Sequence, residues 1–151
     1  NKTEDVDIPL VGAAAIMGYT NKFNHDDKIL VIGRVGTHGI VQRFDYPCWT
    51  SDNTLVIKSN CYEYIYQILK LIDYKAMNRG STQPLITQGD LKKTEIIIPS
   101  KECLQKYEDV VGSLMYRYSQ NQIENEKLVL LRDILLPKLM NGEIDVSEVK
   151  I

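Results

Sequence analysis

Two segments of this chain gather side chains that donate and accept hydrogen bonds at close spacing. The first has the sequence GRVGTHG at residues 33–39. The second opens the stretch NRGSTQPLITQGDLKKTEIIIPS at residues 78–100, which begins basic and rich in hydroxyl and amide groups and ends in a β-branched run. Donors in and just after the first segment are of the kinds that contact phosphates and base edges, and they are Arg34, Thr37, His38 and Arg43.

A phosphate-binding glycine loop is one reading of the segment 33–39. However, the segment lacks the order G-x-G-x-x-G, and a β-branched run follows it where a phosphate site needs the N-terminus of a helix. A hairpin between two strands is the better interpretation. Serine, histidine and aspartate are present, for example Ser81, His38 and Asp52, but no nucleophile elbow joins them. We therefore expect no catalytic residues in this chain.

The composition limits the partners and the compartment. The 151 residues carry a net charge of −2, so any contact with DNA or RNA has to be local. The apolar runs are too short or too interrupted to span a bilayer, and no signal-peptide pattern precedes them. Three cysteines and two histidines show no metal-ligand spacing. We expect a cytoplasmic protein with no membrane partner and no metal site.

Hydrophobic periodicity predicts a small α/β domain in the first hundred residues. Runs at 28–35, 39–44 and 53–58 have the length and β-branched content of strands, and short turn-rich segments join them. Residues 62–74 change to three- and four-residue spacing, which indicates an amphipathic helix packed on the sheet. The run TEIIIP at 94–99 predicts one more buried strand, ended by Pro99. The expected fold class is α/β, with a small mixed or antiparallel sheet.

Residues 101–136 have a different texture, because they are rich in Glu, Lys, Gln and Leu. Two ordinary helices are one interpretation, and a single long helix that pairs with a partner helix, as in a coiled coil, is the one that we favour. Pro137 is expected to close this element, which leaves a tail at 137–151. The apolar stripe expected to face a partner helix consists of Leu104, Tyr107, Val111, Leu114, Tyr118, Leu128, Leu131 and Leu135.

Three pieces of the sequence resemble the specificity subunits of type I restriction-modification systems. They are ILVIGRVGTHGIV at 29–41, STQPLITQGDLKKTEIIIPS at 81–100 and LRDILLPKLMNGEIDV at 131–146. The third is the most distinctive, since LLPKL-x-x-G-E-I after a long helix is similar to the end of these subunits. The pieces stand in the family's order and cover most of the chain.

This resemblance implies a DNA target-recognition domain at 1–100, followed by a spacer and dimerisation helix at 101–136. It also implies a prokaryotic, non-catalytic subunit that directs a methyltransferase and endonuclease complex to its DNA site. The expected partners are double-stranded DNA, methyltransferase subunits and, through them, restriction subunits. S-adenosylmethionine, ATP and magnesium are expected on those partner subunits, and no cofactor is expected here.

The same resemblance turns the two donor-rich segments into candidate DNA-reading loops. Arginine reads guanine, glutamine reads adenine, and hydroxyl groups reach bases or phosphates. Lysines and Arg43 are assigned to the DNA backbone, where they supply the salt-dependent part of affinity. The resulting set of candidate DNA contacts is Lys22, Arg34, Thr37, His38, Arg43, Arg79, Ser81, Thr82, Gln83, Lys92 and Lys93.

The sequence departs from a full specificity subunit because it has one recognition-like domain and one long helix where the full subunit has two of each. It is expected to be the C-terminal half of such a subunit or a half-length subunit that dimerises through its helix. Two other functions stay open. One is an assembly module that docks methyltransferase subunits without reading bases, which suits the acidic balance. The other is an enzyme that uses the segment 33–39. The sequence does not identify the DNA bases that the chain would recognise.

Overall fold

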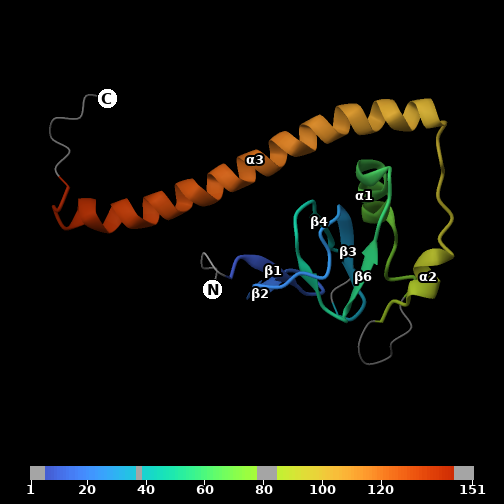
Figure 1. Cartoon of the computed structure of the whole chain (residues 1–151), viewed down its shortest axis with the longest axis horizontal. Helices are drawn as coiled ribbons and strands as arrows, with labels where there is room; N and C mark the ends of the chain where they lie inside the picture. Colours follow the sequence, from blue (N-terminus) through green and yellow to red (C-terminus); the bar gives the residue numbers. More distant parts are fainter. Residues whose placement is uncertain (1–5, 37–38, 78–84, 145–151) are drawn as a thin grey trace. The chain divides into compact units, whose positions relative to one another are not determined.

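We describe the fold from a computed structural model of the chain, which describes residues 6–36, 39–77 and 85–144 (Figure 1). Six short strands and a helix come first, then a short helix, and then a helix of 40 residues. The strands are β1 (Ile8–Val11), β2 (Ile16–Thr20), β3 (Ile29–Gly33), β4 (Val41–Phe44), β5 (Trp49–Thr50) and β6 (Thr54–Ile57). The helices are α1 (Tyr62–Leu71), α2 (Gln88–Lys92) and α3 (Lys101–Met140).

The strands form two small sheets. One has the order β2-β1-β5, in which β1 pairs antiparallel with β2 and parallel with β5. The other has the order β4-β3-β6, and both of its pairings are antiparallel. The α/β class with small mixed sheets, predicted from the sequence, is therefore confirmed, and so are the three strands at 28–35, 39–44 and 53–58.

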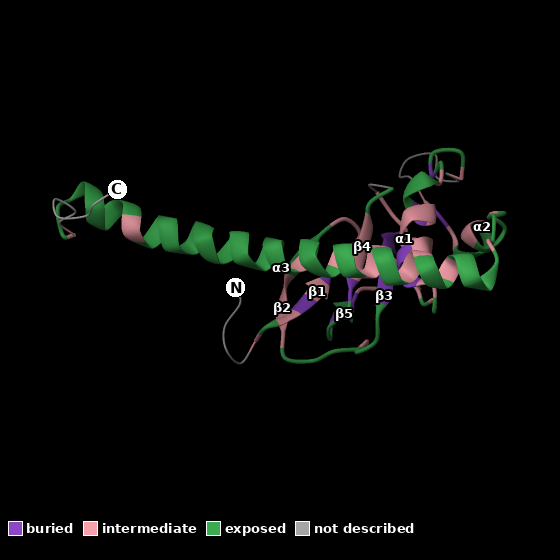
Figure 2. Cartoon of the chain, turned by 90° about the horizontal axis from the view of Figure 1, so that it is seen from above, coloured by how far each residue is buried: buried purple, intermediate pink, exposed green. Residues whose placement is uncertain are grey.

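The core is organised around β3, whose five residues are all buried (Figure 2). Successive side chains of a strand point to opposite faces of its sheet. Leu30 and Ile32 accordingly pack in a cluster with residues of α1, whereas Ile29 and Val31 pack in a second cluster with Val11 of β1. A strand that is covered on both faces explains why this run is continuously apolar in the sequence.

Close backbone approach joins the two sheets at the end of β3. A Cβ atom added at Gly33 would lie 2.5 Å from the carbonyl oxygen of Ala13, in the β1–β2 turn. The amide nitrogen of the Gln42 side chain donates a hydrogen bond of 2.9 Å to the carbonyl oxygen of Gly12 in the same turn. The turn is therefore fixed against the end of β3, and glycine at position 33 leaves the space for it.

Two local predictions are wrong. The run 94–99 is not a buried strand, because it forms no regular structure and leaves Ile97 and Ile98 exposed by 81% and 73%. Pro137 does not end the long helix, which continues to Met140. A proline inside a helix removes one intrahelical hydrogen bond and crowds the carbonyl four residues before it. In the last turn that cost falls on few bonds, and α3 tolerates it.

The long element is one continuous helix, so the alternative of two separate helices is excluded. At 1.5 Å per residue its 40 residues extend for about 60 Å. Its described side chains include no buried residue. The chain divides into two compact units, one ending at Glu108 and the other beginning at Asp109, so the first two turns of α3 belong to the first unit. Within the described ranges, no helix has the length and apolarity to cross a membrane.

Candidate functional site

A single bridge between distant residues joins the two donor-rich segments. Val35 pairs antiparallel with Leu85, and the backbone N–H of Ile86 donates a hydrogen bond of 2.9 Å to the carbonyl oxygen of Arg34. The chain enters the segment 36–39 directly after Val35, and it leaves the segment 78–84 directly before Leu85. Val35 and Leu85, which are described residues next to the two segments named from the sequence, thus lie side by side just beyond the end of β3.

Arg34 is a predicted DNA contact that lies among the described residues, directly after the last residue of β3. Its side chain is half-buried, and its Nε atom is buried without a hydrogen-bond partner among the described residues. An unpaired buried donor costs free energy that a bound acceptor recovers. Arg34 therefore carries a buried donor that no described residue satisfies, one position before the Val35–Leu85 bridge, and the Nε atom of Arg43 is likewise without a described partner.

The pairing of β3 with β6 places a further polar residue opposite Arg34. Gly33 pairs with Thr54, and the next residue of β3 continues this register, since the N–H of Arg34 donates to the carbonyl oxygen of Asn53 at 2.9 Å. Opposed residues of an antiparallel pair project from the same face of the sheet. Asn53 is exposed, and our reading of the sequence did not include it among the contact residues.

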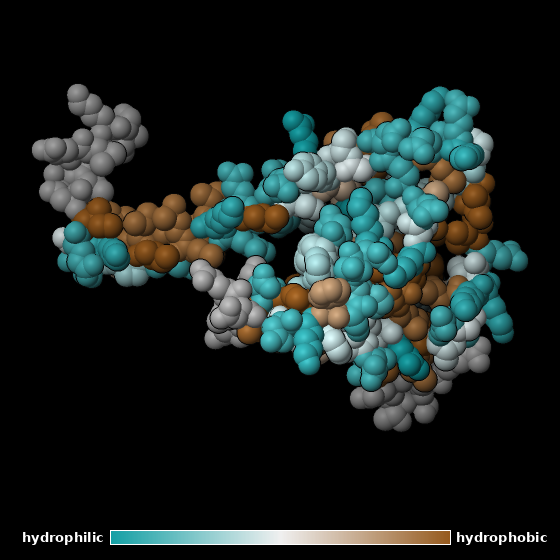
Figure 3. Space-filling view, viewed as in Figure 1, coloured by the Kyte–Doolittle hydropathy of each residue, from teal (hydrophilic) through white to brown (hydrophobic). Residues whose placement is uncertain are grey.

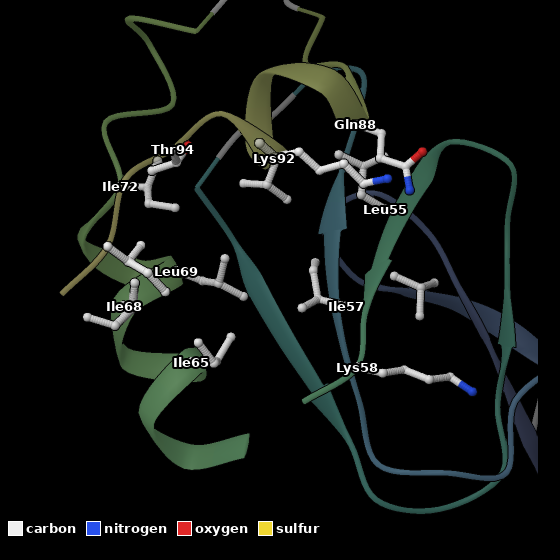
Figure 4. A pocket seen from close by; sticks show the side chains of 13 residues that line it. Leu55, Ile57, Lys58, Ile65, Ile68, Leu69, Ile72, Gln88, Lys92 and Thr94 are labelled. Carbon is white, nitrogen blue, oxygen red and sulfur yellow. The ribbon is translucent and has the colours of Figure 1, made fainter. Parts of the chain in front are cut away.

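Helix α2 adds polar side chains at this same end of β6. Thr87 and Asp90 form a capping box, in which the Thr87 hydroxyl accepts from the N–H of Asp90 at 3.1 Å. This box begins the helix directly after Ile86. Gln88 and Lys92 of α2 line one cavity together with Leu55, which lies at the start of β6 (Figure 4). The structure thus brings Lys92, a predicted contact, to the end of the sheet that carries Arg34.

The cavity between β6, α1 and α2 has a volume of about 370 Å³. Figure 4 shows Ile65, Ile68 and Leu69 of α1 across from Leu55 and Ile57 of β6. The described residues that line it are mainly aliphatic, with Lys58, Gln88, Lys92 and Thr94 as polar members, and they include no carboxylate, histidine or cysteine. Nor does any group of potential metal ligands gather elsewhere among the residues that the structure describes.

Six of the predicted contact residues lie outside the described residues. They are Thr37, His38, Arg79, Ser81, Thr82 and Gln83. Their assignment as DNA contacts stays a prediction.

The structure separates two other predicted contacts from the Arg34 end. Lys22 is exposed beyond the last residue of β2, whereas the turn fixed against Gly33 is at the opposite end of that strand. Arg43 pairs with Leu30, near the start of β3. Lys93 follows α2 and is exposed.

The Arg43 side chain is engaged inside the domain. Its Nη2 atom lies 2.5 Å from Oε1 of Glu63, and both side chains are largely buried. The guanidinium also lies 5.2 Å from the ring centre of Tyr62 and 5.0 Å from that of Tyr66. Burial raises the pKa of Glu63 above its ordinary value, and the Arg43 charge opposes this. These contacts stabilise the packing of α1 on β4.

The predicted partner stripe divides between the two units. Leu104 and Tyr107 belong to the first unit, where the ring of Tyr107 lies 5.7 Å from that of Tyr64 in α1, edge to face. The other members lie beyond Glu108, and Leu114, Tyr118, Leu128 and Leu131 are each more than half exposed. Val111 and Leu135 are partly exposed. Apolar side chains gather around the last turns of α3 (Figure 3, brown), including Leu128, Val129, Leu130, Leu131, Ile134, Leu136, Leu139 and Met140.

The structure thus consists of small mixed sheets with the helix α1 packed on them, followed by a long helix that carries exposed apolar residues. The family model described as the type I restriction modification DNA specificity domain matches residues 1–131, and the chain belongs to this family. The resemblance found in the three sequence pieces is thereby confirmed.

Particular relatives agree with this assignment. The chain is 32% identical over 146 residues to the type I restriction enzyme HindI specificity subunit of Haemophilus influenzae, a match that covers 91% of this chain and 31% of the relative. It is 38% identical over 81 residues to the MjaIX specificity subunit of Methanocaldococcus jannaschii, covering 54% of this chain and 18% of that one.

A solved structure shares the fold. The type I restriction-modification system S subunit from M. genitalium matches with a TM-score of 0.69 at 20% identity, over 92% of this chain and 41% of the other. This chain thus spans less than half the length of each of these three proteins.

Proposed function

We propose that this chain recognises a specific DNA sequence and directs a type I methyltransferase and endonuclease complex to it, without catalysing a reaction itself. The observation that carries the proposal is the Val35–Leu85 bridge, which joins a residue of the segment 33–39 to the residue that follows the segment 78–84. Membership of the specificity-domain family supports it. S-adenosylmethionine, ATP and magnesium would then bind to the methyltransferase and restriction subunits, where the chemistry takes place.

Arg34 is the central residue of this proposal. A guanidinium donates two hydrogen bonds to O6 and N7 of guanine, and this is the commonest specific contact between protein and DNA. The Nε of Arg34 has no partner among the described residues, so a shift of this half-buried side chain toward DNA would break no described hydrogen bond of that atom. The net charge of −2 limits non-specific attraction to phosphates, so base contacts would carry a large share of the discrimination.

The test is selection of binding sites from randomised duplex DNA by the chain assembled with the methyltransferase subunit of its own system. A guanine contact predicts that Arg34→Ala weakens binding to the selected site by about 5- to 150-fold and relaxes the preference at one position. Lys58→Ala is the matched control, because it removes the same charge from an exposed ion pair with Asp27 at the other end of β6. Equal effects of the two variants would contradict base reading by Arg34.

The exposed apolar residues of α3 favour assembly as the second part of the proposal. Contiguous apolar surface of this kind on a protein marks an interaction site. We assign the part of α3 beyond Glu108 to pairing with a helix of a methyltransferase subunit or of a second copy of this chain. If the chain is an assembly module without base readout, replacing Arg34 and Arg79 with alanine leaves DNA binding by the complex unchanged while assembly persists.

Sedimentation equilibrium tests this pairing directly. Leu131 is 51% exposed on α3, so Leu131→Glu keeps a helix-forming residue while placing a charge on the apolar surface. We expect it to weaken self-association or capture of the methyltransferase subunit. Gln122→Glu adds the same charge at an exposed polar position of the same helix and is expected to change neither. A monomer that captures no methyltransferase subunit, before any substitution, would refute the assignment.

A further inference from the structure

The turn between β5 and β6 presents two polar side chains on a fixed backbone. Asp52 and Asn53 are both exposed, and neither side chain makes a hydrogen bond or ion pair with another described residue. Recognition residues commonly stand on loops that a rigid scaffold positions. Free polar side chains on a well-fixed turn are therefore suited to binding.

Hydrogen bonds to two neighbouring segments and one bond within the turn hold it in place. The N–H of Ser51 donates to the carbonyl oxygen of Val11 at 3.0 Å, which ties the turn to β1. The N–H of Thr50 donates to Oδ1 of Asn24 at 2.9 Å. Within the turn, the hydroxyl of Thr54 donates to the carbonyl oxygen of Ser51 at 2.6 Å. The turn is thus pre-organised, and a ligand would not have to order it.

The position of the turn links it to Arg34. The carbonyl oxygen of Asn53 accepts the N–H of Arg34, so the two residues stand opposite each other as the antiparallel register of β3 and β6 runs out. Leu30 and Ile32 of β3 and Leu55 and Ile57 of β6 share one packed cluster. By two-residue alternation, Arg34 and Asn53 project on that same side. Opposed Cβ atoms lie about 5 Å apart, a separation comparable to the spacing of neighbouring base pairs.

We propose that the Ser51–Thr54 turn is a third base-reading element, in which Asn53 contacts adenine next to the base pair read by Arg34. This rests on the proposed function. Asparagine donates to N7 and accepts from N6 of adenine in the major groove, and each such pair discriminates strongly against other bases. The sequence offered no signal for it, because Asn53 lies in a short polar turn of ordinary composition.

The chemistry of Asp52 favours a base edge over the phosphate backbone as the ligand of this turn. A carboxylate repels phosphates, but it accepts a hydrogen bond from N4 of cytosine. If the turn lies at the DNA, Asp52→Asn removes the repulsion and raises affinity for non-cognate duplex, more so at low salt.

The experiment compares Asn53→Ala with Asn60→Ala in the chain assembled with the methyltransferase subunit. Asn60 is also exposed and follows β6 at its other end, so it is a matched control. Binding sites are selected from randomised duplex DNA, and each adenine of the selected site is then replaced by 7-deazaadenine, which lacks the N7 acceptor. We expect one such replacement to weaken wild-type binding by about 2- to 13-fold, because it removes one of the two hydrogen bonds.

The same replacement should weaken binding no further once Asn53 is alanine, while Asn60→Ala behaves as the wild type. Urea unfolding of the Asn53 variant should match the wild type, since this exposed side chain makes no hydrogen bond or ion pair with another described residue. Unchanged base preference in Asn53→Ala, or a loss at a base other than adenine, overturns this inference and leaves the proposed function standing. If wild-type protein selects no sequence at all, the proposed function fails, and the role of Asn53 fails with it.

Discussion

Replacing Glu108 should destabilise the recognition domain, although this residue belongs to the long helix. Helix α1 begins after Cys61, which makes no side-chain cap. The missing acceptor comes from Glu108, whose carboxylate accepts the N–H of Glu63 at 3.1 Å and the N–H of Tyr64 at 2.8 Å. A negative group at the N-terminus of a helix also interacts favourably with the helix dipole.

The expected cost follows from these contacts. Loss of an N-terminal cap costs about 0.5–2 kcal/mol, and hydrogen bonds to a charged group contribute about 1.5–3 kcal/mol each. Glu108 also repels the neighbouring carboxylate of Glu63, and it contributes to the raised pKa of that group. Its removal relieves this repulsion, so we expect Glu108→Ala to lower the free energy of unfolding by about 1–2 kcal/mol. Glu108→Gln retains one acceptor and should lose about half as much.

Urea unfolding followed by tryptophan fluorescence reports this effect in the first compact unit, which ends at Glu108. Trp49 is the single tryptophan of the chain and lies in β5. Glu102→Ala is the matched control, because Glu102 stands on the same helix in an exposed ion pair with Lys106 and should cost less than about 0.5 kcal/mol. If Glu108→Ala and Glu102→Ala shift the unfolding midpoint equally, Glu108 does not cap α1 in solution.

Two further predictions concern the interior of the same unit. Burial raises the pKa of Glu63, so the folded chain holds this proton to a higher pH than the unfolded chain does. The free energy of unfolding of the wild type, compared with that of Glu63→Gln, should therefore fall as pH rises above about 4.5. The fall should be about 1.4 kcal/mol for each pH unit between the unfolded and the folded pKa. Urea unfolding between pH 4 and 7 checks this, and a flat difference would count against it. Gly33→Ala should cost about 1–3 kcal/mol, because its Cβ would overlap Ala13, whereas Gly112→Ala in α3 meets no atom within 4 Å and should stabilise its helix by up to about 1 kcal/mol. Thermal unfolding of both variants tests the pair, and equal shifts would contradict the close approach of the two sheets.

The sequence correctly predicted the elements whose hydrophobic pattern follows directly from which of their faces are buried. The run of β3 is continuously apolar because both faces are covered, and α1 shows helical spacing because one face packs on the sheet. The run 94–99 has the same β-branched composition, but none of the strands in the described part of the chain pairs with it, and Ile97 and Ile98 remain exposed. β-branched residues favour an extended backbone, but a strand also needs a neighbouring strand with which to form hydrogen bonds.

Helix α2 was missed although its signal is local. Thr87 and Asp90 stand in the spacing of a capping box, and the structure shows both of its hydrogen bonds. Five residues are too few to show an apolar period, so the cap was the signal that could have found this helix. Gln88 and Lys92 owe their place next to the start of β6 to this cap.

The sequence could predict which hydrogen-bond donors belong to the candidate site, but not how the fold arranges them in space. The sequence identified Arg34 as a candidate contact because of its side-chain chemistry. Its position opposite Asn53 depends on the register of β3 and β6. Its position near Leu85 depends on the Val35–Leu85 bridge, which joins residues fifty positions apart in the chain. Arg43 has the same chemistry, yet Glu63 and two tyrosine rings surround its guanidinium. Two arginines nine residues apart thus reach different surroundings because they lie near opposite ends of one antiparallel pair. For this reason Arg34→Ala should alter the choice of DNA sequence, whereas Arg43→Ala should first lower the stability of the domain.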